Sequence, residues 1–104
     1  MDKKDIAWDQ MEGFEGLPNA VQLLKMLSNP HRLAILCLLS DTEWSVNEIA
    51  SKIDLNQSAL SQHLSKLKAD RLVQFRREHN KLYYSLSSPQ AKSLIATLKK
   101  LYCK

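Results

Sequence analysis

The 104-residue sequence predicts a mainly α (α+β) domain in which four helices precede a β-hairpin and a last helix. Three observations lead to this prediction. Apolar residues recur at helical spacing up to about residue 70, two short segments with alternating apolar residues follow, and the final segment carries an apolar stripe. Only a three-residue break separates the third and fourth helices. The order α-α-α-α-β-β-α is that of a winged helix-turn-helix.

The first two predicted helices are separated by a helix-stop signal. Asn19 can cap the first helix, and Ser-Asn-Pro at 28–30 ends it and begins the second. The segment 31–40 is apolar on nearly all sides, which predicts a buried helix. Residues 41–44 are then expected to form a loop.

The next two helices form the predicted helix-turn-helix. Ser45 is followed three residues later by Glu48, which predicts a capping box at the start of the third helix. After the break at 54–56, the fourth helix is expected from about Gln57 to Ala69. Asp54 is expected to take the left-handed conformation that glycine usually supplies in this turn.

A β-hairpin and a last helix complete the domain. The strands are predicted at 72–76 and 82–86, with His79 and Asn80 at the turn between them. Ser88 can cap the last helix, and Pro89 suits its first position. The apolar stripe of this helix comprises Ala91, Leu94, Ile95, Leu98, Leu101 and Tyr102.

The charge is unevenly distributed along the chain. Gly13, Gly16 and Pro18 mark a boundary, so we divide the chain into a leader, residues 1–18, and a domain, residues 19–104. The leader carries two Lys and five acidic residues, and a short helix is expected in it from Ile6 to Met11. The domain carries thirteen basic and six acidic residues. A basic domain behind an acidic leader suggests a polyanionic partner.

Composition also narrows the class of protein. The longest apolar run, Leu33 to Leu39, is too short to span a bilayer, and no signal peptide is visible. We therefore expect a cytoplasmic protein with no membrane partner, whose two cysteines are thiols. No Gly-rich phosphate loop and no nucleophile beside a base are visible, so neither an enzyme nor a cofactor is expected.

The fourth helix has a polar side suited to the major groove of double-stranded DNA. Leu60 and Leu64 should hold it to the core. Gln can bond adenine through two hydrogen bonds, Ser bonds several base edges, and His bonds a base or a phosphate, while Lys suits a phosphate. The candidate contacts on this helix are Gln57, Ser58, Ser61, Gln62, His63 and Lys66.

The hairpin supplies a second group of candidate DNA contacts. Arg76, Arg77, His79 and Lys81 crowd its tip. A basic hairpin beside a recognition helix can reach the neighbouring minor groove or its phosphates. Taken alone, the same charges also fit an ordinary solvated hairpin, so the adjacent helix pair carries this interpretation.

Three segments resemble the ArsR/SmtB family, also called the arsenic-repressor family. They are LLKMLSNPHRLAILCLL, SVNEIASKIDLNQSALSQHLSKLKADRLV and RREHNKLYYSL, and the likeness extends over about residues 20–102. The resemblance implies a homodimeric winged-helix transcriptional regulator, a repressor or an anti-silencer, that binds a palindromic operator and leaves it when an inducer binds. It also implies that the first and last helices form the dimer interface.

The metal-binding motifs of that family are missing. Where some metal sensors of the family have Cys-Val-Cys, this chain has Ser45-Val46-Asn47. Others have Asp and His ligands on the last helix, but residues 88–104 contain no His, Asp or Glu. No metal ligands are therefore assigned. A metal-responsive repressor remains the alternative, with ligands such as Cys103 and a histidine shared across subunits.

The two cysteines carry a further resemblance. Ile35-Leu36-Cys37 and Tyr102-Cys103 are similar to the cysteine contexts of the sulfide- and persulfide-responsive branch of the family, which includes the haemolysin-regulator group. The resemblance implies an inducer that is a reactive sulfur species or an oxidant, and a disulfide or sulfur-bridged link between the two thiols. From the residues alone, Cys37 also fits an inert buried thiol and Cys103 an incidental terminal residue.

Overall fold

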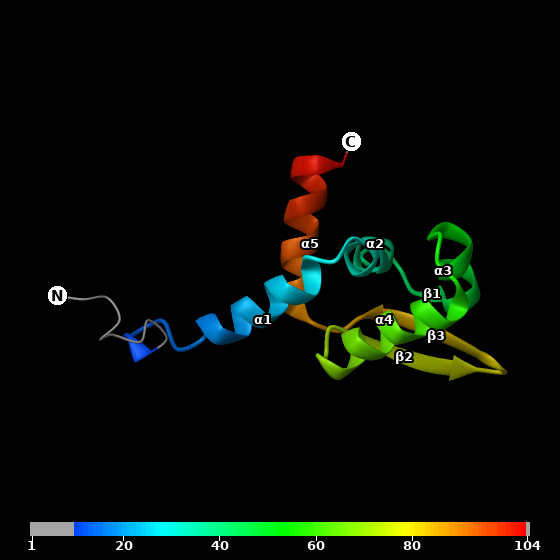
Figure 1. The fold of residues 1–104 in the computed structure, drawn as a ribbon, viewed down its shortest axis with the longest axis horizontal. Helices are drawn as coiled ribbons and strands as arrows, with labels where there is room; N and C mark the ends of the chain where they lie inside the picture. Colours follow the sequence, from blue (N-terminus) through cyan, green and yellow to red (C-terminus); the bar gives the residue numbers. More distant parts are fainter. Residues whose placement is uncertain (1–9, 104) are drawn as a thin grey trace.

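The computed structural model describes residues 10–103, which form five helices and one small antiparallel sheet (Figure 1). The winged helix-turn-helix predicted from the sequence is confirmed. Most of the leader, residues 1–9, lies outside the described residues, and so does most of the helix expected from Ile6 to Met11. The elements in chain order are α1 (Leu17–Leu27), α2 (Pro30–Leu39), β1 (Trp44–Ser45), α3 (Val46–Lys52), α4 (Gln57–Ala69), β2 (Val73–Glu78), β3 (Lys81–Leu86) and α5 (Pro89–Tyr102).

The start of α1 differs from the prediction. The helix begins at Leu17, with Gly16 rather than Asn19 at the N-cap position. Pro18 lies in its first turn, where a residue without an N–H breaks no helical hydrogen bond. The start of α2 is as predicted, because the Asn29 side chain accepts hydrogen bonds from the backbone N–H groups of His31 and Arg32. In the first turn of α1, Pro18 has no N–H group that would need a partner. In the first turn of α2, the Asn29 side chain binds two of the free N–H groups.

The helix-turn-helix follows the sequence closely. Ser45 and Glu48 form the predicted capping box, in which each side chain bonds the backbone N–H of the other residue. The α4 helix spans the predicted residues, and Asn56 caps it by accepting from the N–H of Ala59 at 2.8 Å. The expectation for Asp54 was wrong: among the described non-glycine residues, only Arg71 and His79 have positive φ.

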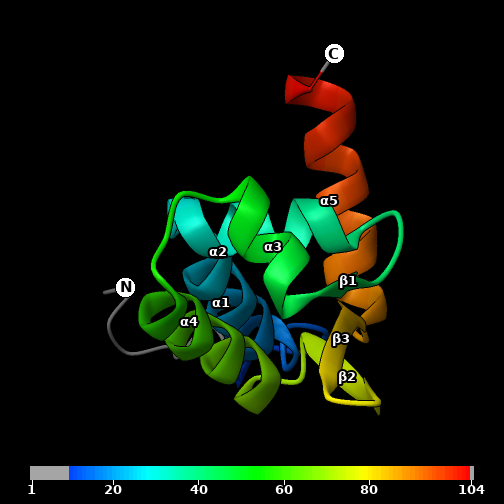
Figure 2. The ribbon, with the colours of Figure 1, turned by 90° about the vertical axis from the view of Figure 1, so that its right-hand side faces the viewer.

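The sheet has one strand more than predicted. Trp44 and Ser45, expected in a loop, form β1 and pair with Tyr84 and Tyr83 of β3. The strand order is β1-β3-β2, so β3 is central. The β2–β3 hairpin is longer than expected and extends to the pair Glu78–Lys81, with His79 and Asn80 at its tip. The hairpin projects beside α4 as a wing (Figures 1 and 2).

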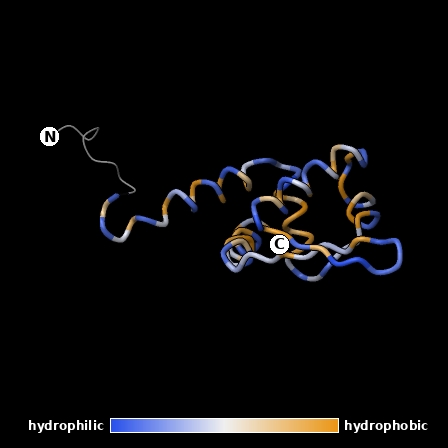
Figure 3. The backbone as a smooth tube through the Cα atoms, turned by 90° about the horizontal axis from the view of Figure 1, so that it is seen from below, coloured by the Kyte–Doolittle hydropathy of each residue, from blue (hydrophilic) through white to orange (hydrophobic). Residues whose placement is uncertain are grey.

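The core lies where α2, α4 and α5 meet the sheet, and the most apolar parts of the backbone gather there (Figure 3). Its largest fully buried side chains are Ile35, Leu36, Ile49, Leu60, Leu64, Leu67 and Ile95. Across residues 10–103, no helix has the length and apolarity that a bilayer crossing needs. In contrast to the core, α1 extends away from the body, and the last turn of α5 stands clear of it (Figure 1). Large apolar side chains are exposed on both, among them Leu17, Val21, Leu24, Leu101 and Tyr102.

Candidate nucleic-acid interface

The α4 helix divides cleanly into a buried side and a polar side. Leu60, Leu64 and Leu67 are at most 1% exposed and hold the helix to the core. The opposite side is exposed and forms a shallow hollow lined by Ser58, Ser61, Gln62, Ser65 and Lys66. In Figure 2, α3 and α4 face the viewer together with the wing. Four of the predicted α4 contacts therefore share one surface.

Gln57 lies at the start of this surface and also touches the preceding helix. Its Nε2 donates a hydrogen bond to Oδ1 of Asn47 at 3.2 Å. Both side chains are exposed. The bond holds the Gln57 amide beside α3, which positions its other donor and acceptor at the beginning of α4. The sequence reasoning did not include Asn47, because its link to Gln57 crosses the turn.

His63 lies apart from the other α4 candidates. It is only partly exposed, its ring lies 5.7 Å from the ring of His31, and its Nδ1 is buried without a hydrogen-bond partner. Burial lowers the pKa of His63, and the positive charges of Arg32, His31 and Lys66 lower it further. The neutral imidazole is therefore favoured where α4 packs against α2.

The histidine predicts a specific pH dependence of stability. Because folding lowers the pKa of His63, the unfolded chain binds this proton more tightly than the folded chain. The free energy of unfolding should therefore fall as the pH falls below the ordinary value of about 6.5. Urea unfolding of the wild type and of His63→Gln at about pH 7.5 and 5.5 tests this, and the variant should lose less stability. Equal losses in both proteins would contradict it.

The predicted DNA contacts on the wing fall into two groups, side chains that are exposed near the tip and one, Arg76, that is bound by carboxylates of the protein. Arg77, His79 and Lys81 are exposed at or near the tip, and His79 takes the left-handed conformation that the tight turn requires (φ 57°). Arg76 is occupied: its Nε donates to Oε2 of Glu43 at 3.0 Å, and its Nη1 lies 2.6 Å from Oε1 of Glu78. Within residues 10–103, three of the four predicted wing residues have no side-chain hydrogen bond or ion pair, while the charge of Arg76 is compensated within the protein.

The guanidinium of Arg76 has a third partner. It lies over the ring of Tyr83, 4.6 Å from the centroid. The hydrogen bond from Arg76 holds the pKa of the Glu43 carboxyl below its usual range. Glu43 was not predicted as a functional residue, because it precedes Arg76 by 33 positions and no local pattern links the two.

The two cysteines belong to different elements of the fold. Cys37 is half-buried on α2, Cys103 is exposed just after α5, and both are free thiols. Burial raises the pKa of the Cys37 thiol, the negative charge of a Cys103 thiolate raises it further, and Lys99 lowers it. The Cys37 thiol therefore responds to charges on α5, at Lys99, and just after it, at Cys103.

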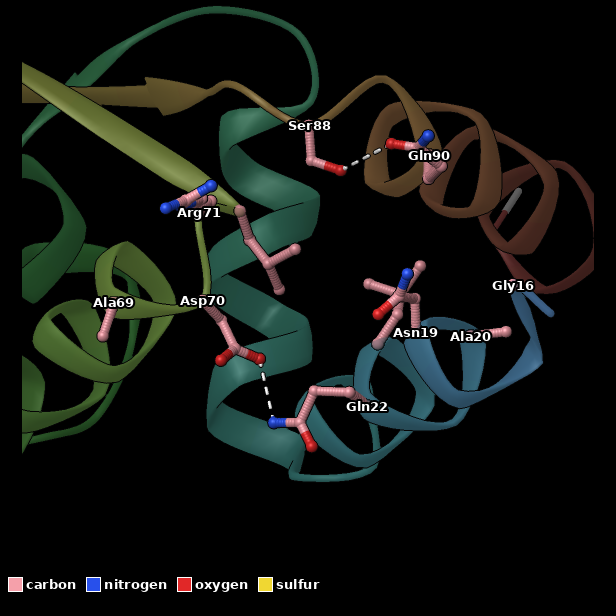
Figure 4. A pocket seen from close by; sticks show the side chains of 11 residues that line it. Gly16, Asn19, Ala20, Gln22, Ala69, Asp70, Arg71, Ser88 and Gln90 are labelled. Atoms are coloured by element: carbon pink, nitrogen blue, oxygen red, sulfur yellow. Dashed lines mark hydrogen bonds between the residues drawn. The ribbon is translucent and has the colours of Figure 1, made fainter. Parts of the chain in front are cut away.

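A pocket separates α1 from the start of α5 and the α4–β2 turn (Figure 4). One hydrogen bond crosses it, from Nε2 of Gln22 on α1 to Oδ2 of Asp70 at 3.0 Å. Within residues 10–103, no group of three or more His, Cys, Asp or Glu side chains could hold a metal ion. The pocket shows that α1 is held to the body mainly at its C-terminal end, where Met26 and Leu27 are buried.

Comparisons with known proteins agree with this geometry. The family model described as "Bacterial regulatory protein, arsR family" matches residues 29–74. The transcriptional activator HlyU of Vibrio cholerae is 51% identical over 84 residues, which cover 81% of this chain and 78% of HlyU. Among solved structures, reduced HlyU from Vibrio cholerae superposes with a TM-score of 0.84 and 48% identity, over 86% of this chain and 95% of that one. The transcriptional repressor BigR of Xylella fastidiosa superposes with a TM-score of 0.82 and 31% identity, over 100% and 99% of the two chains.

These likenesses cover the helix-turn-helix, the wing and both flanking helices. Identities of 48–51% over most of both chains show that this chain and HlyU are homologous. These relatives are described as a transcriptional activator and a transcriptional repressor. The chain described here belongs to the ArsR family of bacterial transcriptional regulators.

Proposed function

We propose that this regulator binds a palindromic operator as a homodimer and that the thiols of Cys37 and Cys103 control its affinity for DNA. The observation that carries the DNA contact is the exposed hollow on α4, lined by serine, glutamine and lysine and flanked by the wing. Gln62 and the serines read base edges, while Lys66, Arg77 and Lys81 contact phosphates. His63 contributes by packing α4 onto α2, because its ring is turned toward His31.

DNA selected from a random-sequence duplex library gives the operator and tests this contact. Gln62→Ala should weaken binding to the selected duplex by about 1–3 kcal/mol and relax the preference for one base pair. Lys66→Ala should weaken binding to all duplexes alike and reduce the slope of log K against log salt by about 0.9. Fluorescence anisotropy titrations at several salt concentrations measure both effects. If neither variant changes affinity, this side of α4 does not face the DNA.

The uncovered apolar side chains support the homodimer. Val21 and Leu24 on α1 are 40% and 57% exposed, and Leu101 and Tyr102 at the end of α5 are 65% and 78% exposed. Apolar groups gathered on two projecting helices are typical of an interface. In a two-fold dimer, the same face of each subunit meets its copy, so each subunit would cover the apolar side chains of the other.

A charge on this face should break the dimer. Leu24→Glu is expected to raise the dimer dissociation constant at least about tenfold, since burying a leucine contributes about 1.5–3 kcal/mol and a buried carboxylate opposes association. Sedimentation velocity over a range of concentrations measures it. Lys25→Glu is the control, because it places the same charge on the neighbouring exposed residue. Equal dissociation constants for the two variants would contradict an interface at Leu24.

Two observations support control by the thiols. The pKa of the Cys37 thiol on α2 is raised by burial and, to a smaller extent, by the charge of Cys103 at the end of α5. In addition, the related HlyU of Vibrio cholerae has a solved structure described as the reduced protein, which suggests that its redox state matters.

The chemistry balances with an organic persulfide, RSSH, as the oxidant. The exposed Cys103 thiolate attacks the terminal sulfur and becomes a persulfide, and RSH leaves. The Cys37 thiolate then attacks the sulfur bound to Cys103, and hydrogen sulfide leaves as the disulfide forms. Overall, two protein thiols are oxidised, and RSSH is reduced to RSH and H₂S.

A bridge between these cysteines would act on the dimer. It would tie the end of α5 to α2, and α5 contributes to the proposed interface. Two recognition helices must lie about 34 Å apart to enter successive major grooves of one duplex face. A small change in the angle between subunits would alter this spacing and lower operator affinity.

A further inference from the structure

The connection between α2 and α3, residues 40–45, is fastened at its first end to α5. Nζ of Lys99 donates a hydrogen bond to Oγ of Ser40 at 2.9 Å and lies 3.0 Å from Oδ2 of Asp41. Oγ of Ser40 in turn donates to the carbonyl oxygen of Cys37 at 2.6 Å. The backbone N–H of Cys103 donates to the carbonyl oxygen of Lys99 at 2.8 Å. The first end of this connection is thus one hydrogen bond from the backbone of Cys37 and two from that of Cys103.

The second end of the α2–α3 connection is fastened to the wing and to the helix-turn-helix. The carboxylate of Glu43 accepts hydrogen bonds from Arg76 of β2. The next residue, Trp44, pairs with Tyr84 of β3. Ser45 then caps α3. This end of the connection is therefore attached both to the wing and to the helix-turn-helix.

We propose that the α2–α3 connection transmits the position of the last turn of α5 to the wing, with Lys99 and Arg76 as positioning residues at its two ends. The proposal rests on the thiol control proposed above and names the route by which that control reaches the wing. The connection is only six residues long and contains no glycine, so its backbone has little conformational freedom between its two attachments. A bridge from Cys103 to Cys37 would move the last turn of α5 and, with it, Lys99.

The charge arrangement on the wing fits this role for Arg76. Its guanidinium is bound by two carboxylates and stacks on the ring of Tyr83, so it serves to hold β2 to the connection rather than to neutralise a phosphate. Arg77 and Lys81 remain for DNA. In this arrangement, a shift at Glu43 changes the orientation of the wing relative to α4, and with it the positions of Arg77 and Lys81.

Two pairs of matched variants test the route. Lys99→Met removes the bonds to Ser40 and Asp41, and Lys100→Met is its control on the next exposed residue. Glu43→Gln weakens the bond between connection and wing, and Glu78→Gln is its control, because Glu78 binds Arg76 from within the wing. Operator affinity is measured for each reduced protein and after complete oxidation by an organic persulfide, verified by mass spectrometry of the thiols.

The expected result is a smaller response in the two test variants alone. The ratio of reduced to oxidised affinity should fall by about 2–30-fold in Lys99→Met and Glu43→Gln and stay at the wild-type value in Lys100→Met and Glu78→Gln. Because oxidation is driven to completion, any change in the reactivity of Cys37 does not enter the ratio. Wild-type ratios in both test variants would overturn the proposal.

A second measurement is independent of the thiol chemistry. In the reduced protein, Lys99→Met should shift the backbone amide NMR signals of residues 76–84, and Lys100→Met should not. If the wild type itself keeps its affinity after oxidation, the thiol control proposed above is wrong. The NMR signals still test whether the α2–α3 connection links α5 to the wing. Unchanged wing signals in Lys99→Met would overturn the route in either case.

Discussion

The variants Cys37→Ser and Cys103→Ser are expected to bind the operator like the reduced wild type and to remain bound after persulfide treatment. The wild type should lose affinity by about 5–150-fold, the usual range of coupling between two sites. Each variant keeps only one of the two sulfur atoms and cannot form the bridge from α2 to the end of α5. Anisotropy titrations with the selected duplex, before and after treatment, measure the loss.

The design separates bridging from simple modification. Mass spectrometry should find a mass loss of two hydrogens in the wild type and an added sulfur on the remaining cysteine of each variant. A reductant should restore the wild-type affinity. If both variants leave the DNA as readily as the wild type, the bridge is not the cause of release.

Leu64→Ala is expected to have the largest effect on stability. Its side chain is 1% exposed and packs α4 against the core. Truncating a buried leucine to alanine costs about 2–5 kcal/mol, because apolar contact is lost and a cavity remains. Since domains of this size are stable by only about 5–15 kcal/mol, DNA binding should weaken as well. Urea unfolding at one fixed protein concentration measures the change.

Ser65→Ala is the matched control for this variant. Ser65 is the next residue of α4, and it is exposed. Its replacement should change the free energy of unfolding by no more than about 0.5 kcal/mol. The two neighbours thus distinguish core packing from a general effect on the helix. A loss below about 1 kcal/mol in Leu64→Ala would contradict the packing described here.

Local signals in the sequence were sufficient for most of the fold. The capping box of Ser45 and Glu48 and the bounds of α4 depend on residues within one or two helical turns, and both were predicted correctly. The strand β1 was missed because two residues carry no periodicity and because its partner, β3, lies about 40 positions later. The expectation for Asp54 was wrong because the α3–α4 turn closes without a left-handed residue; among the described non-glycine residues, positive φ occurs only at Arg71 and His79.

The candidate site, like the fold, was predicted only where the contacts are local in the sequence. Helical spacing was enough to place Ser58, Ser61, Gln62 and Lys66 on one surface, since they all lie within α4. It was not enough for residues whose partners lie on other elements. His63 packs against His31 of α2, and Arg76 is bound by Glu43, and no pattern along the chain predicts either contact.

The exposed apolar face of α1 would link the abundance of this regulator to its lifetime in the cell, if the proposed dimer covers it. If assembly covers Val21 and Leu24, a bacterium with few copies holds part of them as separate subunits. Separate subunits with exposed hydrophobic side chains are preferred targets of chaperones and proteases. Turnover would then be fastest when the regulator is scarce, and a cell would need to exceed a threshold of synthesis before regulation begins.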